Sequence, residues 1–199
     1  MLKTLACGFG GAFIYNNLSS QKNTNTPIQN IQKSTQRNAI CILYPDNNSG
    51  VKGIVSFQQD KFSDPCKIVV NVKGLKPNSS HGFHIHEFGD LTEGCTTAGP
   101  HYNPEGKNHG GPLDQERHVG DLGNLKTDEK GNAYQATKDK LVTLYGEFSV
   151  LGRSCVVHQN KDDEGKGGHE LSLTTGNSGP RVACGVIGIA AEFKNITPK

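Results

Sequence analysis

Short apolar segments separated by turn residues constrain the fold of this chain more than any other feature. Eight segments of strand length follow residue 38, at residues 39–44, 51–57, 67–73, 82–88, 133–137, 141–145, 155–158 and 182–190. Gly, Pro, Asn and Asp interrupt the chain between them, and no apolar stripe of helical period extends beyond two turns. The pattern predicts an all-β domain, an eight-stranded barrel or sandwich with Greek-key connections.

Two long connections depart from this pattern. Residues 89–120 and 160–181 contain Gly, Pro and charged residues but little strand character. Structureless connections of this length are uncommon in compact domains and are often functional. We therefore expect two long functional loops attached to the barrel.

The first 37 residues differ in composition from the rest. Residues 5–15 are apolar and follow Lys3, as in a short signal sequence, whereas residues 16–37 are rich in Asn, Gln, Ser and Thr. We interpret residues 1–37 as a targeting segment and a disordered polar linker, ahead of one domain at 38–199. A secretory route is slightly favoured, and an organellar or a cytoplasmic location are the alternatives.

The charge distribution argues against two classes of function. The chain has 21 basic and 19 acidic residues, and four of the basic ones precede residue 38. Residues 38–199 therefore carry about −2 and show no basic stripe for nucleic acid. No apolar run is long enough to span a bilayer. We expect neither a nucleic-acid partner nor a stable membrane span.

Six of the eight histidines and one aspartate have the spacing of two adjacent metal sites. On a strand, period two puts the rings of His84 and His86 on one face. With His101 and His158 they offer four nitrogen ligands, a set that favours Cu(II). Three histidines and a carboxylate suit a closed tetrahedral zinc site, at His101, His109, His118 and Asp121. His101 belongs to both sets, which requires a bridging imidazolate that spacing alone does not prove.

The motifs around these residues resemble those of copper/zinc superoxide dismutases. The similar stretches are residues 82–89, 99–104, 108–112, 117–124, 156–158, 165–168 and 181–188. They follow one order from residue 38 to 193. The resemblance implies an immunoglobulin-like barrel and an antioxidant enzyme that converts superoxide to dioxygen and hydrogen peroxide by cycling Cu(II) and Cu(I). Residues 169–176 are closer to the plant-type version of the second loop.

The resemblance also assigns roles to single residues. It implies copper at His84, His86, His101 and His158, and zinc at His101, His109, His118 and Asp121. His101 would bridge the metals and take part in catalysis, and Arg181 would hold superoxide beside copper. Asp162 matches an aspartate that links ligands of the two metals. A disulfide between Cys95 and Cys184 is implied as well, although the six cysteines alone allow other pairings.

Partners and alternatives complete the prediction. The resemblance implies a homodimer, with contacts near residues 51–53 and 188–189, and a copper chaperone as donor. One alternative is a copper-delivery protein, but such domains tend to lose copper ligands and to carry a Cys-rich motif, and this chain has no C-x-x-C. A metal-bound structural module without turnover is another, and Arg181 argues against it. We expect His81 and His169 to be ordinary surface or loop histidines.

Overall fold

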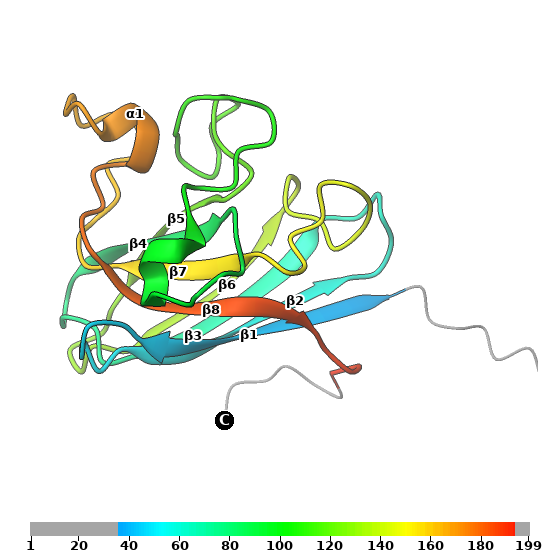
Figure 1. Cartoon of the computed structure of the whole chain (residues 1–199), viewed down its shortest axis with the longest axis horizontal. Helices are drawn as coiled ribbons and strands as arrows, with labels where there is room; N and C mark the ends of the chain where they lie inside the picture. Colours follow the sequence, from blue (N-terminus) through cyan, green and yellow to red (C-terminus); the bar gives the residue numbers. More distant parts are fainter. Residues whose placement is uncertain (1–35, 194–199) are drawn as a thin grey trace, which may run out of the picture. The chain divides into compact units, whose positions relative to one another are not determined.

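A computed structural model of the chain describes residues 36–193, in which eight antiparallel strands form a nearly closed barrel (Figure 1). The strands are β1 (Arg37–Pro45), β2 (Lys52–Gln59), β3 (Cys66–Lys73), β4 (Ser80–His86), β5 (Asp121–Lys126), β6 (Ala133–Asp139), β7 (Ser154–His158) and β8 (Arg181–Ile189). Their order is β5-β4-β7-β8-β1-β2-β3-β6, and contacts between β5 and β6 bring the two ends of this order together. The predicted all-β Greek-key class is confirmed. The predicted targeting segment lies outside the described residues, apart from its last two positions.

Alternating burial explains why these segments form strands. In β3, Ile68, Val70 and Val72 are buried in the barrel, and the lysines at both sides of this run are exposed. Such a period-two pattern buries one face of a strand and leaves the other in water. Strands β4 and β7 differ, because they are buried on both faces. Their second face lies beneath other parts of the chain, and this is where His84 and His86 are found.

One predicted strand is wrong and one was missed. Residues 141–145 form no strand, although Val142 and Leu144 are buried. Their backbone N–H groups donate to the side chains of Asp139 and Gln59 instead of to a neighbouring strand. The eighth strand is β5, which the sequence pattern did not show.

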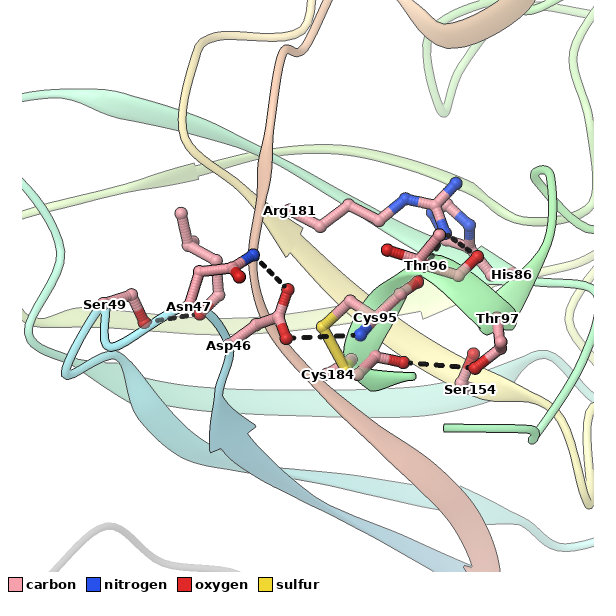
Figure 2. The surroundings of a disulfide bond; sticks show 12 residues. Asp46, Asn47, Ser49, His86, Cys95, Thr96, Thr97, Ser154, Arg181 and Cys184 are labelled. Atoms are coloured by element: carbon pink, nitrogen blue, oxygen red, sulfur yellow. Dashed lines mark hydrogen bonds between the residues drawn. A yellow bond between two sulfur atoms is a disulfide. The ribbon is translucent and has the colours of Figure 1, made fainter. Parts of the chain in front are cut away.

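Two long connections stand on the same side of the barrel in Figure 1. Residues 87–120 join β4 to β5 and contain the 3-10 helix η1 (Gly94–Ala98), and residues 159–180 join β7 to β8 and contain the helix α1 (Ser172–Thr175). A disulfide between Cys95 of η1 and Cys184 of β8 ties the first loop to the barrel (Figure 2). Within residues 36–193, no helix has the length and hydropathy needed to cross a membrane.

Candidate metal centre

Three imidazoles converge on one carboxylate oxygen beneath the first long loop. The Nδ1 atoms of His101 and His109 each lie 2.9 Å from Oδ1 of Asp121, and Nδ1 of His118 lies 3.1 Å from it. Around a tetrahedral zinc ion with bonds of about 2 Å, neighbouring ligand atoms are about 3.3 Å apart. Three nitrogens and one oxygen at these distances therefore form a donor set that fits zinc.

Backbone groups hold Asp121 in this orientation. Its other oxygen, Oδ2, accepts hydrogen bonds from the backbone N–H groups of Gly110 (3.1 Å) and His118 (2.8 Å). Its carbonyl accepts a bond from Arg117, whose guanidinium also pairs with Asp139 at 2.6 Å. Because Asp121 begins β5 and Asp139 ends β6, this buried pair fixes the loop against two strands. Sequence reasoning missed Arg117, which lies next to the predicted ligand His118.

Four histidines form a second group that shares His101 with the first. The ring nitrogens of His84, His86, His101 and His158 lie within 4.8 Å of one another, and all four side chains are buried. With metal–nitrogen bonds of about 2 Å, opposite ligands of a tetragonal copper site are about 4 Å apart. The group therefore has the size and the donor type that Cu(II) prefers.

Hydrogen bonds decide which nitrogen of each ring faces this second group. Nδ1 of His86 donates to the carbonyl of Gly99 (2.9 Å), and Nδ1 of His158 donates to that of Gly179 (3.0 Å), so that both Nε2 atoms remain as donors to a metal. The Nε2 atoms of these two rings lie 3.4 Å apart. Nδ1 of His101 faces Asp121, which leaves its Nε2 toward the second group. Among the described residues, Nε2 of His101 has no hydrogen-bond partner although it is buried.

Asp162 connects the two groups. Its Oδ2 accepts a hydrogen bond from Nε2 of His84 at 2.7 Å, and its Oδ1 accepts one from Nε2 of His109 at 2.9 Å. Nδ1 of each ring then points away from Asp162. Nδ1 of His109 faces Oδ1 of Asp121 at 2.9 Å, whereas Nδ1 of His84 has no hydrogen-bond partner among residues 36–193. A buried nitrogen without a partner is rare in proteins, so Nδ1 of His84, like Nε2 of His101, supports metal binding in the second group.

Burial and neighbouring charges set the protonation of these rings. Burial lowers the pKa of His84, His86 and His101, and lowers that of His158 to about 4, so that these imidazoles are neutral and keep a lone pair for a metal. Burial alone would lower the pKa of His109 too, but hydrogen bonds to Asp121 and Asp162 outweigh it and raise this pKa to about 9.

The pKa of Asp121 is held well below its usual range. Burial by itself would raise it, and the hydrogen bonds of the three surrounding imidazoles reverse this effect. The carboxylate is therefore ionised, which is the form that binds a metal.

Arg181 lies at the start of β8, next to the disulfide (Figure 2). Its guanidinium donates to the carbonyls of Cys95 (2.6 Å) and Gly99 (2.7 Å). Gly99 is also the residue that accepts the hydrogen bond of His86. The positive charge of Arg181 is thereby held in a fixed orientation close to the second histidine group, where it lowers the pKa of His86 further.

One prediction about the remaining histidines is wrong. His169 is exposed in the second loop, as expected, but His81 is buried in β4. Its Nδ1 donates to the backbone carbonyl of His158 at 3.1 Å. Since β4 and β7 are buried on both faces, a polar residue in this strand needs such a partner, and position 81 gave no signal of it in the sequence.

Residues 51–187 match the family model for copper/zinc superoxide dismutase. The chain belongs to this family. The superoxide dismutase [Cu-Zn] of Yarrowia lipolytica is 57% identical over 153 residues, which cover 77% of this chain and 98% of the relative. The superoxide dismutase [Cu-Zn] of Saccharomyces cerevisiae is 54% identical over 151 residues, covering 76% of this chain and 97% of the relative. Copper and zinc, the metals in the family's name, are those that the two donor sets fit.

Proposed function

We propose that the chain disproportionates superoxide to dioxygen and hydrogen peroxide, with copper held by one histidine group and zinc by the other. The copper ligands are His84 through Nδ1 and three Nε2 atoms, those of His86, His101 and His158. The zinc ligands are the Nδ1 atoms of His101, His109 and His118 together with Asp121. One observation carries the proposal, namely that the two ring nitrogens of His101 face different donor sets. The relatives are named as the enzyme, and a copper-delivery protein is not favoured.

Copper, when bound, supplies the one-electron chemistry by which one superoxide is oxidised and a second is reduced. The protein supplies orientation, charge and protons around it. Arg181 attracts the superoxide anion and positions it near the histidine group, because carbonyls of residues 95 and 99 hold its guanidinium. Nε2 of His101 is the atom that takes up and gives back a proton, since its Nδ1 remains held on the Asp121 side.

Metal content and superoxide decay, measured on the same purified protein, test this function. We expect about one copper and one zinc per chain and rapid superoxide decay. A His101→Ala variant removes the shared ring and is expected to lose most of the decay rate and to bind both metals more weakly. His169→Ala, which removes an exposed histidine, is the matched control and should keep both properties. Full copper content without superoxide decay would instead indicate a structural metal-binding module.

A homodimer is part of the same proposal. Exposed apolar side chains gather on the neighbouring strands β2, β1 and β8, where Ile54 pairs with Ile42 and where Ile189 is 83% exposed. Val51, which lies in one of the two segments expected to form contacts, is buried in the core, so Ile54 is the better contact. Sedimentation of an Ile189→Asp variant should show a shift to monomer. Leu113→Asp, at a residue 98% exposed in the first loop, is the control and should not shift. Delivery of copper by a chaperone rests on the resemblance alone.

A further inference from the structure

A groove of about 940 Å³ opens at one end of the barrel, apart from both donor sets. Its walls are the turn between β1 and β2, the connection between β3 and β4, the end of β5 and the chain around residues 159–161 and 180–182. Among the described residues, none of the proposed metal ligands lines it. The proposed function therefore leaves the groove without a role.

The groove carries an excess of positive charge. Lys76, Lys126 and Lys161 line it from three different elements, all three are exposed, and none forms an ion pair with the described residues. Asp46 is the one carboxylate in the described lining. Its oxygens already accept hydrogen bonds from the backbone N–H of Cys95 (3.4 Å) and the side chain of Asn47 (2.9 Å), as Figure 2 shows. Three lysines against one carboxylate leave an excess of two positive charges, and such a local excess on a domain of slightly negative charge attracts anions.

Arg181 also lines the groove, but its guanidinium is not available to a ligand bound there. Its guanidinium is engaged by the carbonyls of Cys95 and Gly99, on the side of β8 where His86 lies (Figure 2). The three lysines therefore give the groove positive charge that is separate from the charge of Arg181 beside the proposed copper site. Variants of the three lysines can test the groove without changing Arg181.

The polar side chains between the lysines can donate hydrogen bonds to the oxygen atoms of an anion. Asn78 and Asn160 line the groove, and their side-chain amides form no hydrogen bond with the described part of the chain. Each amide can donate to an anionic oxygen, and the lysine ammonium groups bind phosphate as point charges. Because the three lysines come from separate elements around a large groove, a ligand with several linked phosphates can reach more of them than a single phosphate can.

We propose that this groove binds oligophosphate, the chain of linked phosphates that inorganic tripolyphosphate and nucleoside triphosphates share. Lys76, Lys126 and Lys161 pair with the phosphate charges, and Asn78 and Asn160 donate to phosphate oxygens. Recognition by exposed cations is sensitive to salt, because mobile ions screen such pairs. The interaction is expected to be strongest at low ionic strength.

Calorimetric titration of the metal-loaded full chain with tripolyphosphate tests the proposal. We expect one site per chain, and a loss of affinity of at least about tenfold in a Lys76→Gln, Lys126→Gln, Lys161→Gln triple variant. A second triple variant, at Lys61, Lys138 and Lys140, removes as many exposed lysines outside the groove and should bind as the wild type does. Both variants should keep the rate of superoxide decay, because none of the six lysines belongs to the proposed catalytic site.

A titration with ATP identifies which part of the ligand is recognised. Affinity for ATP equal to that for tripolyphosphate means that the phosphate chain alone is recognised, and tighter binding of ATP means that the nucleoside contributes as well. Both results support the proposal. Equal losses in the two triple variants, no heat of binding at low salt, or binding abolished by Arg181→Ala but not by the groove variant would overturn it.

Discussion

Gly176 offers the sharpest test of the link between the two metal groups. It follows α1 with a φ of 61°, and a Cβ atom placed there would lie 1.9 Å from Oδ1 of Asp162 and 2.5 Å from Nε2 of His109. Real Cβ atoms do not approach a neighbour within 3.0 Å, so Gly176→Ala must move the carboxylate or the loop by about 1 Å. The hydrogen bond between His109 and Asp162, now 2.9 Å, would then lengthen to about 4 Å and be lost.

Loss of such a bond behind a metal ligand typically weakens metal binding by about 10- to 100-fold, or about 1.4–2.7 kcal/mol. Zinc affinity is measured by competition with a chelator. Gly168→Ala is the matched control, because Gly168 has a φ of 73° but no heavy atom within 4 Å of a new Cβ. It carries the same backbone strain without the clash. Equal zinc affinity in the two alanine variants would refute the role given to Asp162.

Three further predictions concern Arg181, the disulfide and a buried thiol. Arg181→Ala should lower the rate of superoxide decay by more than about tenfold with copper content unchanged, and an unchanged rate at low salt would contradict the role of this residue. Cys184→Ser removes a cross-link between two residues that are 89 positions apart in the sequence, and it should lower the free energy of unfolding by about 4–5 kcal/mol. Reduction of the disulfide in the wild type should destabilise the protein equally. Burial raises the pKa of Cys66 from 9.0 to about 12. The folded state therefore keeps this proton to a higher pH than the unfolded state does. The contribution to the free energy of unfolding that is present below pH 9 is lost as the pH rises toward 12. In Cys66→Val, the free energy of unfolding, measured by denaturation at each pH, should fall less steeply over this range.

Most strands could be predicted because they are short apolar segments between turn residues. In β3, the buried residues Ile68, Val70 and Val72 also alternate with more exposed ones, which is the pattern of a half-buried strand. β5 could not be predicted in this way, since Gly123 interrupts it with a φ of 74° and its sequence is short and polar. Residues 141–145 were wrongly predicted as a strand because their pattern of burial resembles that of a strand. Val142 and Leu144 are buried in alternation, but side chains of Asp139 and Gln59 take the place of a partner strand.

The candidate site was predictable as a set of residues but not as a geometry. The spacing of His84 and His86 follows from the strand, whereas the position of His158 and Asp162 depends on how β7 lies beside β4. Backbone carbonyls such as that of Gly99 decide which nitrogen of a ring faces which histidine group. The sequence does not reveal where these carbonyls lie. His81 was misjudged for a related reason, because strand β4 is covered on both faces by segments distant in sequence.

The carbonyl oxygen of Gly99 joins two components that are otherwise separate in the chain. It accepts hydrogen bonds from both Nδ1 of His86 and the guanidinium of Arg181. A change in the backbone at this single residue would therefore disturb the orientation of the imidazole and of the guanidinium at once.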